Sequence, residues 1–311
     1  MVYSLILKLL AVAALGFFLY RRRIINEVVL KFLGDFLIKI TIPALIFASL
    51  CRNFSFSFRP PWWVFILWSL VIFILAIFIS FLLFFWAKKH HLFSESLSLV
   101  VFQNSGYLPL NIAFFLLSPF LREKFLVFVF LYLLGYNILI WSIGSFFIFR
   151  SQEKFRFSSL FSPPVAAALL AFLVVGIKVN TYIPESVYSY LFLIGNLSFA
   201  LSLIFLGASL ARIRINLSLP VLIPLFIASL LKLMFLPLGV LFLLFYFKIG
   251  GLLGFFLIVE AAMPAAVSLP LVALWRGKNY EFISQGVLIS HILSLFTIPF
   301  WLGLYLKEFG L

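Results

Sequence analysis

The sequence alternates long apolar runs with short polar stretches from one end to the other. Six runs carry no charged residue, and each supplies the roughly 20 apolar residues that a helix needs to cross a bilayer. This pattern predicts an all-α polytopic membrane protein. The charge-free runs are residues 60–87, 96–121, 125–149, 157–177, 186–211 and 282–306.

Together with the apolar stretches between them, these runs predict ten transmembrane helices. The expected spans are residues 2–20, 29–50, 62–86, 97–119, 125–149, 163–179, 187–211, 219–247, 251–275 and 282–306. Polar loops are expected at residues 51–61 and 122–124. A polar cytoplasmic linker, 151–162, separates five spans in residues 1–150 from five in residues 163–311. Because five is odd, a second copy must enter the membrane upside down, as in the inverted repeats of secondary transporters.

Two of the expected spans are interrupted by residues that do not suit a helix in contact with lipid. Residues 103–111 of the fourth span hold three amides, a Gly and a Pro, and residues 260–270 of the ninth span hold a Glu and two Pro. Gly lowers helix propensity, and Pro removes a backbone donor and clashes with the preceding turn. Backbone groups freed inside a membrane are tolerated only against protein or a water-filled cavity. Two interruptions at corresponding positions of the two halves predict a transport site.

The ends of an interrupted helix are suited to bind charged solutes. Unpaired N–H groups at the start of one half-helix favour anions, and unpaired C=O groups at the end of the other favour cations. Polar side chains of both interruptions can add hydrogen bonds to such a site, and a tyrosine can add an aromatic wall. These candidate contacts are Asn104, Ser105, Tyr107, Asn111, Glu260 and Ser268.

Glu260 is an acidic residue inside an expected span. A charge at the membrane centre costs about 2.5–3.5 kcal/mol on insertion scales, which makes Glu260 a functional candidate by default. It either binds the proton or cation that drives transport, or it has a structural role, paired with Lys232 or hydrogen-bonded to the freed backbone. Lys232 is expected to support the site as a tie between helices rather than as a substrate ligand. Asn137 and His291 are expected to make hydrogen bonds between helices.

Composition agrees with the membrane class, and the positions of the basic residues account for the high net charge. The chain is 65% hydrophobic and 10% charged, whereas soluble domains are about half apolar and about a quarter charged. Its net charge of +14 comes from basic residues at loop ends and not from a stripe that follows nucleic acid, so no nucleic-acid partner is expected. With the N-terminus outside, cytoplasmic loops hold thirteen Lys and Arg residues and outer loops hold seven. This bias predicts a multi-pass protein of the cell (inner) membrane with both termini extracytoplasmic.

Two further observations concern single residues. Cys51 is the only cysteine, so the chain can form neither an internal disulfide nor a cysteine-based metal site. No metal or other cofactor is expected, apart from coupling to sodium or protons. Asp35 and Lys39 are four residues apart in the second span, so they share a helix face and are expected to pair.

Four motifs follow one another in order along the whole chain. Gly16 near the end of the first span precedes a basic turn at residues 21–23, and an Ile-x-Ile-Pro-Ala-Leu core lies in residues 40–47. Residues 103–109 read Gln-Asn-Ser-Gly-Tyr-Leu-Pro, and residues 261–264 read Ala-Ala-Met-Pro. Together these motifs resemble those of the auxin efflux carrier (PIN-like) family of membrane transporters, in its bacterial branch.

The resemblance implies a ten-helix inverted repeat in which broken helices four and nine cross at their prolines. Helices 1, 2, 6 and 7 would form a scaffold, and helices 3–5 and 8–10 a moving transport domain. It also implies a small organic anion at the crossover and, as a further partner, a second copy of the chain. Gln103 stands where the family has Gly, and Asn111 where many bacterial members have Pro. The family's crossover residues correspond here to Asn104, Gly106, Pro109, Met263 and Pro264.

The leading hypothesis is therefore a carrier of a small organic anion, such as a carboxylate metabolite, that works by alternating access in the lipid bilayer. The runner-up is a sodium- or proton-coupled symporter or antiporter of another solute class. Related carriers of bile acids use sodium, which makes Glu260 and Asn111 candidate cation contacts. A membrane-embedded enzyme is disfavoured because His291 and Glu260 form no recognisable catalytic set. A passive channel suits two interrupted helices less well, and no nucleotide-binding loop supports an ATP-driven pump.

Overall fold

The computed structural model of the chain describes residues 2–87, 92–141, 148–149, 161–213 and 216–311. The regular structure of these residues is helical, apart from one isolated antiparallel β-bridge. Six of their helical stretches are long and apolar enough to cross a membrane. The all-helical, multi-pass membrane class that the apolar runs predict is thus confirmed. These stretches are Glu27–Asn53, Trp63–Phe81, Pro119–Trp141, Glu185–Ala211, Leu219–Phe247 and Tyr280–Phe309.

The described residues of the first half contain three long helices and several shorter pieces. Asn26 begins the second helix by accepting a hydrogen bond from the N–H group of Val29 at 2.9 Å, so it caps that helix terminus. A five-residue π-helical turn, η1, then precedes Pro43 and joins two α-helical pieces. The elements are α1 (Val2–Arg21), α2 (Glu27–Phe36), η1 (Leu37–Thr41), α3 (Ile42–Asn53), α4 (Trp63–Ala87), α5 (Phe93–Val101), α6 (Tyr107–Leu116) and α7 (Pro119–Trp141).

The second half contains a second π-helical turn, η4, which again lies just before an X-Pro pair. Its first helix starts at Pro163, where the fixed φ of proline suits a first turn and its missing N–H group has no intrahelical partner to lose. The elements are α9 (Pro163–Gly176), η3 (Val179–Tyr182), α10 (Glu185–Ala211), α11 (Leu219–Leu230), η4 (Leu231–Phe235), α12 (Leu236–Phe247), α13 (Gly251–Ala262), α14 (Leu269–Trp275) and α15 (Tyr280–Phe309).

Two expected loops differ from the structure. Residues 122–124 are helical, because α7 begins at Pro119 and its first turns carry these charged side chains. The loop expected from Cys51 begins only after Asn53, since α3 continues through three more residues. The linker 151–162 lies outside the described residues except for positions 161 and 162. Charge alone therefore misplaced both loops, because polar residues are tolerated in the terminal turns of helices.

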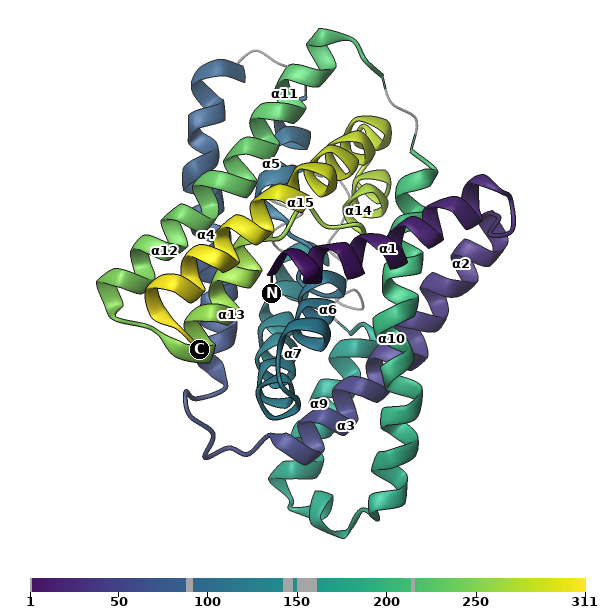
Figure 1. Cartoon of the computed structure of the whole chain (residues 1–311), viewed down its shortest axis with the longest axis vertical. Helices are drawn as coiled ribbons and strands as arrows, with labels where there is room; N and C mark the ends of the chain where they lie inside the picture. The colour runs from purple at the N-terminus through teal and green to yellow at the C-terminus, as the bar shows by residue number, and fades with distance from the viewer. Residues whose placement is uncertain (1, 88–91, 142–147, 150–160, 214–215) are drawn as a thin grey trace.

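The helices pack into two groups. In the first helix group, α1 and α3 pack against α10, and α9 packs against α3. In the second helix group, α4 packs against α5 and α7, and α15 packs against α11, α13 and α14, with α6 joined through α7 and α12 through α13. Figure 1 shows α3, α9 and α10 together at the lower right and α4, α11 and α12 at the left. The groups meet where α1 contacts α6 and α15, α10 contacts α6, and α3 contacts α7.

Glycines allow α1 and α10 to approach closely. A Cβ atom at Gly207 of α10 would overlap the carbonyl oxygen of Ala13, and one at Gly16 of α1 would overlap that of Ile204. Small residues at a helix–helix contact let backbones come together and gain van der Waals contact, which is a main source of association in lipid. The first helix group is therefore held by a tight backbone contact.

Substituting Gly207 with alanine should lower the free energy of unfolding by about 1–3 kcal/mol, because the added methyl group overpacks this contact. The matched control is Gly303→Ala in α15, where an added Cβ meets no atom within 4 Å. That change should stabilise the protein by about 0.5–1 kcal/mol through helix propensity. Thermal unfolding of the detergent-purified variants measures both effects, and equal shifts in melting temperature would contradict the packing.

Candidate functional site

Two pairs of short helices flank non-helical segments. Helix α5 ends at Val101 and α6 begins at Tyr107, so residues 102–106 are not helical. Helix α13 ends at Ala262 and α14 begins at Leu269. Both segments overlap the interruptions that Gly, Pro and the amides mark in the sequence, and the first begins one residue earlier, at Phe102.

The two non-helical segments lie directly against each other and are called the paired segments below. The N–H group of Asn104 donates to the carbonyl oxygen of Pro264 at 2.8 Å. The N–H group of Ala266 donates to the carbonyl oxygen of Phe102 at 3.0 Å, and Gln103 and Ala265 form an antiparallel bridge. Backbone groups that lose their helical partners are thereby satisfied by the other segment.

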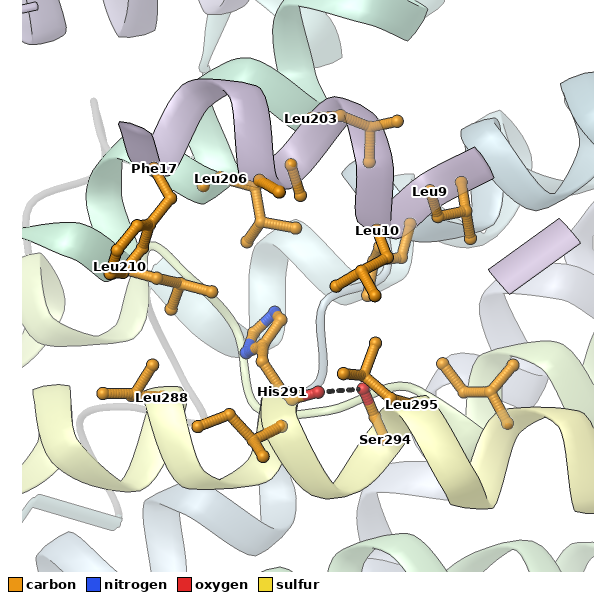
Figure 2. A pocket seen from close by; sticks show the side chains of 16 residues that line it. Leu9, Leu10, Phe17, Leu203, Leu206, Leu210, Leu288, His291, Ser294 and Leu295 are labelled. Atoms are coloured by element: carbon orange, nitrogen blue, oxygen red, sulfur yellow. Dashed lines mark hydrogen bonds between the residues drawn. The ribbon is translucent and has the colours of Figure 1, made fainter. Parts of the chain in front are cut away.

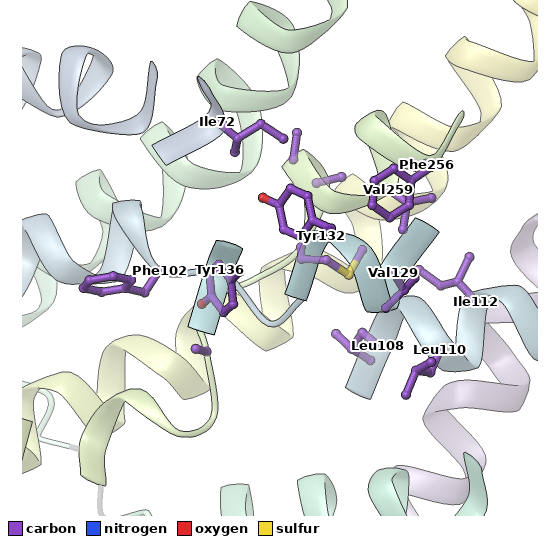
Figure 3. Packing of buried hydrophobic residues seen from close by; sticks show 14 of the residues in the cluster. Ile72, Phe102, Leu108, Leu110, Ile112, Val129, Tyr132, Tyr136, Phe256 and Val259 are labelled. Carbon is purple, nitrogen blue, oxygen red and sulfur yellow. The ribbon is translucent and has the colours of Figure 1, made fainter. Parts of the chain in front are cut away.

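Gln103 connects the paired segments to two other helical elements, η4 and α7. The ammonium of Lys232 donates to its Oε1 at 3.1 Å, and its Nε2 donates to the hydroxyl of Tyr132 at 2.6 Å. The hydroxyl of Tyr136 donates to the backbone carbonyl of Gln103. Figure 3 shows both tyrosines of α7 within the buried cluster that also contains Val259 of α13. Each polar group of the Gln103 side chain is therefore used within a buried network.

Glu260 lies beside this network and is fully buried. Neither of its carboxylate oxygens accepts a hydrogen bond of normal geometry from the described residues. Ser105, Gln103 and Lys232 nevertheless lie near enough to interact with it. The three ion pairs found among the described residues do not include Glu260; one of them is the expected pair of Asp35 with Lys39, at 3.3 Å.

Asn104 faces a different neighbour from Gln103, as successive residues of extended backbone do. Its Nδ2 lies 3.3 Å from Nε2 of His291, whose Nδ1 lies 2.8 Å from the carbonyl oxygen of Val287. Because that carbonyl only accepts, Nδ1 carries the hydrogen and Nε2 accepts from Asn104. His291 of α15 therefore makes the inter-helical hydrogen bond that its position in a span predicts.

A cavity of about 270 Å³ lies next to His291, between the two helix groups. Figure 2 shows the imidazole projecting from α15 into the space bounded by leucines of α1 and α10. Apart from His291 and Ser294, all of its lining residues are apolar. These residues are Leu9, Leu10, Ala13, Ala14, Phe17, Leu108, Leu203, Leu206, Gly207, Leu210, Leu288, Ile292, Leu295 and Ile298.

Two of the candidate contacts face the first helix group instead of the buried network. The ring of Tyr107 packs against that of Phe205 of α10, with centroids 5.8 Å apart. Nδ2 of Asn111 donates to the carbonyl oxygen of Tyr107 at 2.8 Å and to the hydroxyl of Ser202 of α10 at 2.9 Å. These side chains therefore join α6 to α10, and the structure does not group Asn111 with Glu260.

The remaining candidate residues lie in several different parts of the structure. Gly106 precedes the first turn of α6, and Pro109 is buried within that helix. Met263 is fully buried within the paired segments, whereas Ser268 is half-buried at the start of α14 and its side chain does not cap that helix. Asn137 of α7 is half-buried and takes no part in the hydrogen bonds found among the described residues, so the inter-helical hydrogen bond expected of it is not found there. A role for any of these residues in binding stays a prediction.

Sequence reasoning missed the tyrosines of the network. Tyr132 and Tyr136 are four residues apart on α7, and both are buried. A tyrosine inside an apolar span usually finds a hydrogen-bond partner when it is buried. Two tyrosines four residues apart lie on the same face of a helix and make that face polar. This spacing was the signal in the sequence that could have found them.

Removing the hydroxyl of Tyr136 should leave the carbonyl of Gln103 without a partner at the paired segments. Tyr136→Phe should therefore lower the free energy of unfolding by about 1–3 kcal/mol. The matched control, Tyr246→Phe, removes a hydroxyl from a side chain that is 71% exposed, and should change stability by less than about 0.5 kcal/mol. Thermal unfolding of the purified variants compares the two, and a Tyr136→Phe melting temperature equal to that of the wild type would refute this role.

Comparison with known proteins gives a family match. A family model described as membrane transport protein matches residues 1–159 and 151–302. No curated protein matches the chain significantly. The matched family is one of transporters and not of enzymes, and it is of the auxin-efflux-carrier type that the four motifs resemble. Because the match spans most of the sequence, the chain belongs to the membrane transport protein family.

Proposed function

We propose that this transporter carries a small organic anion across the membrane by alternating access. In this proposal the chain forms ten transmembrane helices as two inverted sets of five. The α5–α6 and α13–α14 pairs are then the broken fourth and ninth helices, and the solute binds where they cross. Residues 1–150 and 163–311 form the two repeats.

The observation that carries the proposal is the direct hydrogen bonding between residues 102–106 and 263–268. Non-helical backbone at membrane depth is tolerated only where protein or a cavity surrounds it, and such segments hold the solute in many carriers. Here the paired segments are also adjacent to a cavity, since Asn104 is bonded to His291, which lines it.

Three features favour an anion. Helix α6 begins at Tyr107, so the free N–H groups of its first turn lie at the paired segments and make an electropositive end. Lys232, which is fully buried and bonded to Gln103, offsets the negative charge of Glu260, so that charge does not repel an anion. The side-chain amide of the neighbouring Asn104 has a second N–H hydrogen that can be donated to an anion. A carboxylate-sized group suits this combination.

Alternating access requires two bodies that move against each other. In our proposal the first helix group is the scaffold and the second is the transport domain. The cavity supports this division, because α1 and α10 supply one wall and α6 and α15 supply the other. A solute in the cavity therefore contacts both bodies, so its binding can depend on their relative position.

A polar tie joins the two groups at one end. The guanidinium of Arg212, at the end of α10, bonds to Glu27 of α2 at 3.0 Å and to the hydroxyl of Tyr280, the first residue of α15. Glu27 also accepts from the hydroxyl of Tyr20 of α1 at 2.6 Å. The tie must loosen when the groups separate on this side, which gives the proposed movement a defined contact to break.

The bias of basic residues supports a location in the cell (inner) membrane, with the Arg212 tie on the cytoplasmic side and both termini outside. The proposed partners are the organic anion, the lipid bilayer and a second copy of the chain. The exposed apolar side chains of α1 and α10 are suited to lipid or to such a copy.

A second candidate function is coupled transport of another solute, driven by sodium or protons. The observation in its favour is Glu260, a fully buried carboxylate with both oxygens free of normal hydrogen bonds among the described residues. Thermal stabilisation of the purified protein across a panel of carboxylates, amino acids and auxin-like acids, at varied pH and sodium concentration, separates the two candidates.

Proteoliposomes loaded with one acid from that panel should accelerate uptake of the same radiolabelled acid, because a carrier exchanges solute faster than it returns empty. Asn104→Ala removes a hydrogen bond at the cavity and should reduce exchange at subsaturating solute by about tenfold, as expected for a hydrogen bond to a charged group. The matched control is Asn216→Ala at an exposed position. Uptake without exchange acceleration would indicate a channel, and equal loss in both variants would disprove the role of Asn104.

The alternating-access proposal predicts that loosening the tie exposes the cavity. In a Cys51→Ser background, Leu210→Cys places a thiol in the cavity wall. Adding Tyr280→Phe, which removes one hydrogen bond to Arg212, should raise the labelling rate with a membrane-impermeant maleimide by about fivefold. Tyr246→Phe, distant from the tie on α12, is the control and should leave the rate unchanged. Equal rates with and without Tyr280→Phe would oppose the proposed movement.

A further inference from the structure

Lys232 places its ammonium group in the protein interior, where burying a charge is costly. It lies in the π-helical turn η4, between α11 and α12, and none of its side chain is exposed. π-helical turns are rare and often occur at functional sites. An ammonium removed from water loses its hydration, so a fully buried lysine needs compensating partners. The residues around Lys232 therefore reveal what the charge does.

Buried oxygens of three different kinds lie at Gln103, Ser105 and Glu260 in this part of the buried network. Oε1 of Gln103 is an amide oxygen 3.1 Å from Nζ. The Glu260 carboxylate forms no ion pair with Lys232 among the described residues, but it lies within electrostatic reach of the ammonium, and Ser105 and Gln103 lie beside that carboxylate. Both carboxylate oxygens and the hydroxyl of Ser105 are buried without a normal hydrogen bond from the described residues. Amide, carboxylate and hydroxyl oxygens are the ligands that hard cations take from proteins.

We propose that the Lys232 ammonium, bonded to Gln103, takes the place of a monovalent cation that the buried oxygens of Gln103, Ser105 and Glu260 would otherwise bind. A site that already holds one positive charge repels a second in surroundings of low polarity. The carrier therefore takes no sodium at the paired segments, and the charge of Glu260 is balanced from within the chain. This inference deepens the proposed function, because it selects uncoupled anion transport over the sodium-coupled alternative.

The position of the site also explains how it stays separate from the solute. Gln103 points to Lys232, whereas the next residue, Asn104, is bonded to His291 at the apolar cavity. The balanced pair of charges is thus on one side of the paired segments and the cavity on the other. A lysine on a packed helix cannot leave with the solute as a free ion would, so the site stays filled in every state of the carrier.

Removal of the lysine side chain should turn the site into one that binds a free cation. Purified Lys232→Ala should melt about 3 °C higher in sodium chloride or methylammonium chloride than in choline chloride at equal ionic strength, with saturation, if the cation is present at about ten times its Kd. Choline is too large to replace the ammonium. The wild type should melt at the same temperature in all three salts, because its site is filled.

Two controls assign the effect to this site. Lys39→Ala removes another lysine from a π-helical turn, η1, but its side chain is 61% exposed, so the three salts should act alike on that variant. Lys232→Ala combined with Glu260→Gln removes the negative charge and should abolish the preference for sodium and methylammonium. If Lys232→Ala does not fold in choline, Lys232→Ser is tested in the same salts, and folding only in sodium or methylammonium supports the proposal.

Three results would overturn the inference. A saturable stabilisation of the wild type by sodium over choline would show that a free cation binds while Lys232 is present. Equal melting of Lys232→Ala in all three salts would show that no cation site is left behind, and so would failure of both Lys232 variants to fold in any salt. The melting experiment needs no transported solute. Its result therefore stays valid even if exchange assays reject the carrier hypothesis.

Discussion

The structure depends on one constraint, namely that backbone polar groups away from water must be paired. Helices satisfy this requirement internally, but residues 102–106 and 263–268 cannot. They satisfy it by bonding to each other, with Asn104 donating to Pro264 and Ala266 donating to Phe102. The pairing brings elements from opposite halves of the chain to one place, and the buried network is built around it.

The extended backbone of the paired segments separates two environments. Successive side chains of such backbone point in opposite directions, so Gln103 meets Lys232 and Tyr132 while Asn104 meets His291. Charged groups that need compensation are thus isolated from an apolar cavity that can receive the body of a solute. A continuous helix could not divide neighbouring residues in this way, because its polar face would continue along i, i+3 and i+4 positions.

The two helix groups differ in how they are held together. Within the first group, glycines bring the backbones of α1 and α10 into contact, which leaves little freedom for relative movement. Between the groups, an apolar cavity and a few polar contacts such as that of Arg212 with Tyr280 form the boundary. Rigid-body motion is the easiest deformation when each body is tightly packed and the boundary between the bodies is partly open.

Much of this architecture follows from the sequence, because hydrophobic periodicity and the conformational limits of Gly and Pro are local properties. They determined the membrane class, the positions of the interruptions and the pairing of Asp35 with Lys39, which are four residues apart. Only the tertiary structure decided which polar residues meet. Lys232 and Gln103 are 129 positions apart, and Asn111 turns to α10 rather than to Glu260. Such contacts depend on how whole helices pack, and in an apolar sequence many packings bury similar surface.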